Sequence, residues 1–145
     1  MNSTLISMLG KLGAGIAMAC VVLTSHAQVS GTRWQVRVMD LKHQVKAEGT
    51  IRLTERPETG SCMGGHWKVA VVEAKTVSDD KFFPLNEPLS YEIENGHITL
   101  GRTRICDGYL FLNGKFGNKT IRGTYRAPGF GRSQQLGYFS LTKIQ

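Results

Sequence analysis

From Trp34 onward the sequence repeats one pattern: short runs in which apolar and polar residues alternate. Trp34, Val36 and Val38 would share one face of a strand, with charged or polar residues between them. A period of two is typical of a half-buried β-strand, because successive side chains point to opposite faces of a sheet. No window between residues 28 and 145 shows a convincing helical period. The pattern therefore predicts an all-β fold.

Eight such runs follow one another, which predicts eight strands. Their apolar positions are Trp34, Val36 and Val38; Gly49, Ile51 and Leu53; Trp67, Val69 and Val71; Leu89, Tyr91 and Ile93; Ile98 and Leu100; Tyr109 to Leu112; Ile121, Gly123 and Tyr125; and Gly137, Phe139 and Leu141. Val72 and Ala74 interrupt the third run and indicate a β-bulge.

The connections between these runs favour hairpins. Asn95-Gly96 predicts a type I′ turn, and Asn113-Gly114 and Gly117-Asn118 indicate further turns around the sixth strand. Longer connections are expected at 56–66, 78–88 and 127–135. Eight sequential strands with one apolar face each are buried best when the sheet closes, since closure removes exposed edges. We expect one antiparallel eight-stranded up-and-down barrel over residues 28–145, with a two-sheet β-sandwich as the alternative.

In size, strand count and meander the chain resembles the lipocalin and avidin group of small barrels. Gly31-Thr32-Arg33-Trp34 is similar to the Gly-x-Trp motif of that group, with one extra residue before the tryptophan. The resemblance implies that Trp34 packs across the barrel floor. The aromatic cluster that lines the biotin pocket of avidins is missing, so the resemblance implies an architecture and no ligand residues.

The first 27 residues are typical of a secretory signal peptide. A polar stretch precedes an apolar one from Leu12 to Leu23, and Ser25 and Ala27 fit a small-residue cleavage pattern. No apolar run reaches the roughly 20 residues that span a bilayer, so no transmembrane segment is expected after cleavage. A lipidated Cys20 is the alternative. We expect a secreted or periplasmic protein.

Cleavage would leave Cys62 and Cys106, an even pair in an oxidising compartment. A disulfide between them would close a loop of about 45 residues, worth roughly 4 kcal/mol in the chain-entropy model. The alternative is that Cys62 and His66 act as metal ligands, although one Cys-x3-His without a second half-site is a weak signal. We favour the disulfide and expect no metal and no cofactor.

Charge is sorted along the chain. Residues 28–100 hold 9 basic and 10 acidic side chains, whereas residues 101–145 hold 8 basic side chains and 1 acidic one. Consecutive strands of a meander are neighbours, so these cations would concentrate on one wall and attract anionic partners. The expected partner-binding residues are Arg102, Arg104, Lys115, Lys119, Arg122, Arg126, Phe130 and Arg132.

These patterns favour an exported, non-enzymatic binding protein. Its expected partner is an acidic protein or an anionic envelope component, and an inhibitor or immunity-type role would use the same surface. Nucleic acid is disfavoured because no aromatic platform accompanies the cations. Simple solubility is the other interpretation of the charge.

Two alternatives stay open. One is a carrier with a small apolar ligand inside the barrel, in a cavity lined by Trp34, Trp67, Tyr91, Tyr125 and Phe139. The other is a small barrel enzyme with His66 or His97 beside a carboxylate. No catalytic residue is assigned, because the sequence shows no nucleophile with a base, no paired carboxylates and no metal-ligand set.

Overall fold

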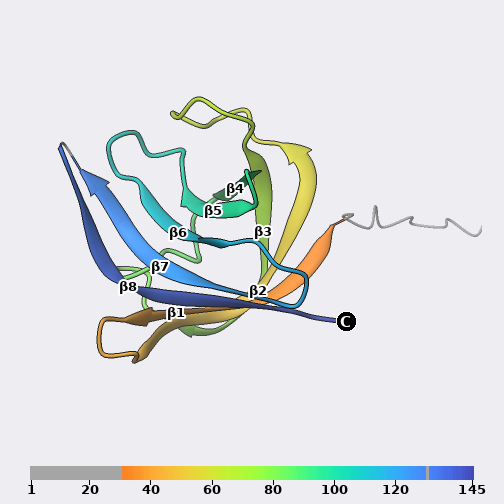
Figure 1. Ribbon diagram of the computed structural model, residues 1–145, viewed down its shortest axis with the longest axis vertical. Coiled ribbons are helices and arrows are strands. Elements are labelled where there is room, and N and C mark those ends of the chain that lie inside the picture. The colour runs from red at the N-terminus through yellow and green to blue at the C-terminus, as the bar shows by residue number, and fades with distance from the viewer. Residues whose placement is uncertain (1–30, 130) are drawn as a thin grey trace, which may run out of the picture.

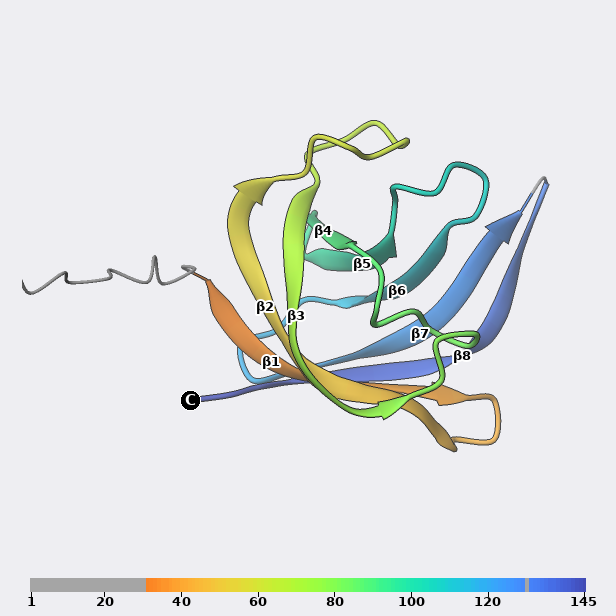
Figure 2. The same cartoon turned by 180° about the vertical axis from the view of Figure 1, so that it is seen from behind.

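The computed structural model describes residues 31–129 and 131–145, which form a closed antiparallel barrel of eight strands (Figures 1 and 2). The strands are β1 (Thr32–Asp40), β2 (Val45–Pro57), β3 (Lys68–Ser78), β4 (Leu89–Glu94), β5 (His97–Arg102), β6 (Leu110–Lys115), β7 (Thr120–Gly129) and β8 (Arg132–Lys143). Each strand pairs with the next, and β8 closes on β1. The up-and-down barrel is therefore confirmed, and the sandwich is not formed.

Two sequence predictions concern residues outside the ranges that the structure describes. The expected signal peptide lies outside the described residues, and so does Phe130. Within the described part of the chain, no helix has the length and hydropathy needed to cross a bilayer.

The barrel interior is filled by the inward row of each strand. Ile51, Tyr125 and Phe139 are almost completely buried and belong to one continuous hydrophobic cluster. The connection between β3 and β4 adds to this cluster, because Phe83 packs edge-on against the Tyr125 ring at 5.4 Å between ring centres. The Tyr125 hydroxyl also donates a hydrogen bond to the carbonyl oxygen of Phe82. The 79–88 segment thus packs into the barrel core.

Two glycines make room for the Phe139 ring of β8. Gly114 on β6 faces Gly123 on β7, and Phe139 is the β8 partner of Gly123. A Cβ on Gly123 would lie 2.7 Å from the Phe139 ring and 2.0 Å from the carbonyl oxygen of Asn113. The turn expected at Asn113-Gly114 is therefore wrong: both residues lie within β6, and the glycine serves core packing.

The turn expected at Asn95-Gly96 is confirmed. These two residues alone join β4 to β5, and both have positive φ, 50° and 74°. The long connection expected over residues 127–135 is wrong. Gly129 still pairs with Arg132, so β7 and β8 extend into a hairpin that projects from the barrel (Figure 1).

We predict that Gly123→Ala destabilises the fold by about 1–3 kcal/mol, the usual cost of overpacking a core. The added methyl group must displace either the Phe139 ring or the β6 backbone. Gly64→Ala is the matched control, because no atom lies within 4 Å of the position of its Cβ. Denaturant unfolding of both variants measures the difference, and equal stability of the two would contradict this packing.

Candidate binding cleft on the outer face of the barrel

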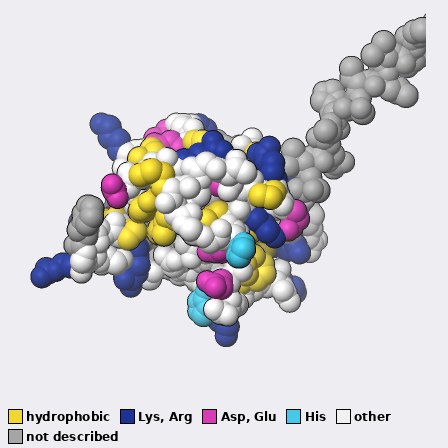
Figure 3. Space-filling view, turned by 90° about the horizontal axis from the view of Figure 1, so that it is seen from above, with side chains coloured by type: hydrophobic (Ala, Val, Ile, Leu, Met, Phe, Trp, Pro, Cys, Tyr) yellow, Lys and Arg dark blue, Asp and Glu magenta, His cyan; other side chains and the backbone are white. Residues whose placement is uncertain are grey.

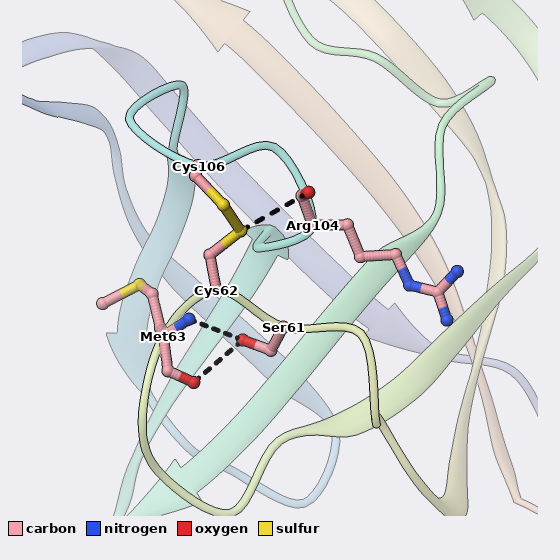
Figure 4. Close-up of a disulfide and its surroundings, with 5 residues drawn as sticks. All are labelled: Ser61, Cys62, Met63, Arg104 and Cys106. Carbon is pink, nitrogen blue, oxygen red and sulfur yellow. Dashed lines mark hydrogen bonds between the residues drawn. A yellow bond between two sulfur atoms is a disulfide. The ribbon is translucent and has the colours of Figure 1, made fainter.

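A disulfide joins the two loops that rise above the outer face of β4 and β5. Cys62 in the β2–β3 connection is bonded to Cys106 in the β5–β6 connection, with a Cα–Cα distance of 5.4 Å (Figure 4). The Cys62 N–H also donates to the Thr103 carbonyl at 2.9 Å. Figure 4 shows Met63 and Arg104 extending on opposite sides of this bridge. The predicted disulfide is confirmed.

The end of the β2–β3 connection is hydrogen-bonded to β4. The His66 backbone N–H donates to Glu92 of β4 at 2.5 Å, and the Trp67 indole N–H donates to the Gly64 carbonyl at 2.9 Å. Gly65 has a φ of +118°, and a Cβ there would meet the Glu92 carboxylate at 2.8 Å. Glycine is the residue that adopts this positive φ without strain.

A buried carboxylate anchors the base of the same loops. Glu58, 1% exposed, accepts hydrogen bonds from Arg104 at 2.9 Å and from the Gly60 N–H at 2.6 Å. Ser90 donates to it at 3.4 Å and is itself bonded to Thr103 at 2.9 Å. Burial alone would raise the pKa of Glu58. The Arg104 guanidinium and the Gly60 N–H stabilise the charged form and hold the pKa below its usual value of 4.5.

Three aromatic rings form a stepped stack on the outside of the barrel. Trp67 lies 5.8 Å from Phe111 and Phe111 lies 5.9 Å from Tyr109, with interplanar angles of 15° and 10°. Phe111 is the β6 partner of Gly101, where an added Cβ would come within 3.1 Å of the Phe111 ring. The missing side chain at Gly101 therefore leaves space for the Phe111 ring on the outer surface.

Trp67 therefore lies outside the barrel, not in the interior where it was expected. The inward row of β3 contains Ala70, which pairs with the buried residues Leu53 and Leu89. Since side chains alternate along a strand, Trp67 and Val69 occupy the outer row. The disulfide-linked loops and the Phe111 ring cover Trp67, which is why its exposure is only 6%.

A cleft of about 420 Å³ opens beside this stack. Its lining comes from the disulfide-linked loops, from the outer faces of β6 and β7, and from the β7–β8 hairpin. The residues are Met63, Asp107, Tyr109, Phe111, Asn113, Arg126, Pro128, Gly129 and Ser133. Figure 3 looks onto the loop end of the molecule, where hydrophobic side chains gather in a strip with Lys and Arg side chains around it. The lining thus combines aromatic and polar groups.

The polar groups of the cleft retain hydrogen-bonding capacity. Arg126 donates through Nε to the Thr124 hydroxyl at 3.2 Å, and the described residues provide no partner for its two terminal amino groups. Asn113 accepts a hydrogen bond from Thr99 at 2.9 Å, which leaves its amide N–H groups as donors. Asp107, held at a φ of +62°, adds an exposed carboxylate to the rim. The cleft therefore offers both donors and an acceptor to a ligand.

The expected partner-binding residues divide into two groups. Arg102 is paired with Glu87 at 3.0 Å and Arg104 with Glu58 at 2.9 Å, so both have structural partners. Within residues 31–129 and 131–145, no ion pair involves the other five expected cations, which we call the basic wall. The basic wall comprises Lys115, Lys119, Arg122, Arg126 and Arg132.

Two other hollows lie outside the cleft. One of about 510 Å³ is formed by basic-wall residues Lys115 and Arg122 together with the β6–β7 turn. The other, about 730 Å³, runs along β3 where its pairing with β4 stops at Ala70, and its lining includes Lys75 and Pro88. The first extends the cationic surface beyond the cleft, and the second marks a gap between neighbouring strands.

The remaining expected cavity residues point inward. Trp34, Tyr91, Tyr125 and Phe139 are at most 3% exposed. The Tyr91 hydroxyl donates to the Thr54 carbonyl at 2.6 Å, and burial, with the nearby Glu55 charge, raises the pKa of Tyr91 to about 12. These side chains pack against one another within the core cluster.

The described histidine rings are not bonded to carboxylates, although the His66 backbone N–H donates to Glu92. His43 stacks on Tyr138 at 4.5 Å between ring centres, and His97 Nδ1 lies 3.2 Å from the Asn95 carbonyl. Among the described residues, no hydrogen bond or ion pair joins a histidine ring to a carboxylate, and no group of three His, Cys, Asp or Glu side chains could hold a metal.

Comparison of the chain with protein-family models, with curated proteins and with solved structures gave no match. The candidate site therefore rests on the geometry of this chain.

We predict that Glu58→Gln lowers the free energy of unfolding near neutral pH by about 1–3 kcal/mol, because it removes the charge that binds Arg104. The pKa of Glu58 is depressed in the fold, so its stabilisation is present above the unfolded pKa and is lost as pH falls through the folded pKa. The difference in free energy of unfolding between wild type and variant should shrink as the pH falls below 4.5. A stability difference that does not depend on pH would show that the Glu58–Arg104 ion pair does not stabilise the fold.

We also predict that replacing both cysteines, Cys62→Ser with Cys106→Ser, costs about 2–4 kcal/mol of stability. The disulfide spans 44 residues, so its loss releases a long loop in the unfolded chain. Amide exchange should accelerate in the two loops and remain slow in β1 and β8. Uniform acceleration across the barrel would show that the disulfide does not act locally on the cleft.

Proposed function

We propose that this chain is an exported, non-enzymatic binding protein that captures an anionic macromolecule on the basic wall. The supporting observation is the unequal neutralisation of charge around the barrel. On β1 to β3, Arg33 and Arg52 share Glu73, and Arg37 is paired with Glu48. On β6 to β8 the basic wall has no acidic partner among the described residues.

Unpaired cations on neighbouring strands favour binding to an anionic surface. Arg122 and Arg126 belong to the same outward row of β7, about 13 Å apart along the strand. Arg122 lines the hollow at the β6–β7 turn and Arg126 lines the cleft. One extended anionic partner could therefore contact both hollows, and the field of the wall would accelerate its approach.

The aromatic cleft supplies the part of this surface where the strongest contacts with a partner are expected. Tyrosine, tryptophan and arginine are enriched among the few residues that carry most of the binding energy of protein interfaces. Tyr109 and Arg126 provide this combination beside the basic wall. Solubility alone would explain the charge but gives no reason for an aromatic cleft among the cations.

The packing of the interior supports a surface mode over an internal ligand. Tyr125 and Phe139 are buried in the core cluster, and Phe83 of the 79–88 segment packs against Tyr125. An apolar ligand inside the barrel would have to displace these rings.

Two features support export. The N-terminal 27 residues have the pattern of a cleaved signal peptide. The exposed cysteine pair forms a disulfide, as is usual in secreted and periplasmic proteins.

We predict that Arg122→Glu with Arg126→Glu weakens capture of anionic envelope material by roughly tenfold or more at low salt. The loss should shrink as salt rises, because the screening length falls from about 10 Å at 0.1 M to about 3 Å at 1 M. Immobilised wild type and variant, exposed to the envelope fraction of the source cells over a salt series, provide the measurement.

Lys42→Glu with Lys81→Glu is the matched control, since it makes the same charge change in the β1–β2 turn and the 79–88 segment. Capture that ignores salt, or that falls equally in the control, would contradict the proposed function.

A further inference from the structure

We infer that the cleft binds an acidic sugar, a six-membered ring that carries a carboxylate and several hydroxyl groups. The inference rests on the proposed function and names its ligand class. It is drawn from four chemical features of the cleft: an aromatic surface, an incompletely bonded guanidinium, an amide with spare donors and a carboxylate on the rim.

The aromatic surface matches the apolar face of a sugar ring. Phe111 lies between Trp67 and Tyr109, and Tyr109, the outermost ring of this stack, lines the cleft. The C–H groups on one face of a pyranose ring are apolar and pack against aromatic rings. Met63 and Pro128 border the same space and add apolar surface to it.

The guanidinium provides the site for the carboxylate. Nε of Arg126 is bonded to Thr124, so the side chain is oriented while both terminal amino groups remain available. Arginine binds carboxylates through two parallel hydrogen bonds, which fixes the direction of the group as well as its charge. A ligand carboxylate would give Arg126 the anionic partner that the described residues do not supply.

The remaining polar groups distinguish a sugar from other anions. The Asn113 amide donates, the Asp107 carboxylate accepts, and the Ser133 and Tyr109 hydroxyls can do both. Hydroxyl groups of a sugar can satisfy all of these at once. Asp107 would repel a phosphate dianion more strongly than a singly charged carboxylate, and an aromatic side chain of a protein partner would offer no hydrogen bonds to Asn113 and Asp107.

The test uses defined probes with the full mature chain. These are oligomers of three residues of galacturonic, glucuronic or mannuronic acid, the corresponding neutral oligomers, and an acidic hexapeptide of glutamate. Titration is followed by backbone amide NMR shifts and by calorimetry. We expect at least one acidic trisaccharide to shift the amides of Tyr109, Asn113 and Arg126 and to bind more tightly than its neutral counterpart.

Variants assign this binding to the cleft. Arg126→Gln should weaken the acidic trisaccharide roughly tenfold or more and have little effect on the neutral one. Tyr109→Ala should weaken both, whereas Tyr109→Phe keeps the ring and should preserve most of the affinity. Lys42→Gln is the control for the loss of one positive charge outside the cleft. Thermal unfolding of each variant shows whether the barrel remains intact.

The outcomes separate the two proposals. If no acidic trisaccharide binds, or if binding is indifferent to both Arg126→Gln and Tyr109→Ala, the sugar assignment is overturned. If the glutamate peptide binds through the basic wall while the sugars do not, the proposed function stands with a protein partner. If no probe binds and envelope capture is independent of salt, both proposals fail.

Discussion

Closure of the sheet is the constraint from which the other features of this molecule follow. Because each strand has a neighbour on both sides, every residue of a strand must face either the core or the outside. Tyr125 faces inward, so its neighbour Arg126 must face outward beside Phe111. The position of the cleft is therefore tied to the register of β6 and β7. A slip of one residue would bury the arginine and expose the tyrosine.

The candidate site on the outer face depends on two loops that return to it. The disulfide connects them, Glu58 binds Arg104 beneath them, and Gly65 lets the first loop approach Glu92. Covalent, ionic and steric contacts thus act on one small region. Loops usually move more than the strands they connect, and these contacts provide the rigidity that a defined binding site requires.

Sequence patterns predicted those features of the fold that depend on residues close together in the chain. The period of two gave the eight strands, and Asn95-Gly96 gave a turn, because both depend on backbone preferences within a few positions. Asn113-Gly114 has the same local chemistry but lies within β6. There the Phe139 ring needs the space at Gly114, and this requirement comes from a strand more than 20 residues away.

The cleft could be predicted only in part. Charge counting located the cations of the C-terminal third, but it could not show that Arg102 is paired with Glu87 while Arg126 is not. The stack of Trp67 on Phe111 joins residues 44 positions apart, and no spacing rule indicates it. The separation of the two cysteines was a usable clue, since a disulfide between them would bring the loops around Met63 and Asp107 together.

The distribution of ion pairs connects the fold to its proposed use. Glu73 binds both Arg33 and Arg52, and it occupies the extra position created where the β2–β3 register shifts. The bulge thus neutralises two cations on one side of the barrel. The basic wall has no equivalent acid in the described chain, so its charge remains available to a partner. The proposed partner would meet this charge on the outer surface, where the unpaired cations and the aromatic cleft lie together.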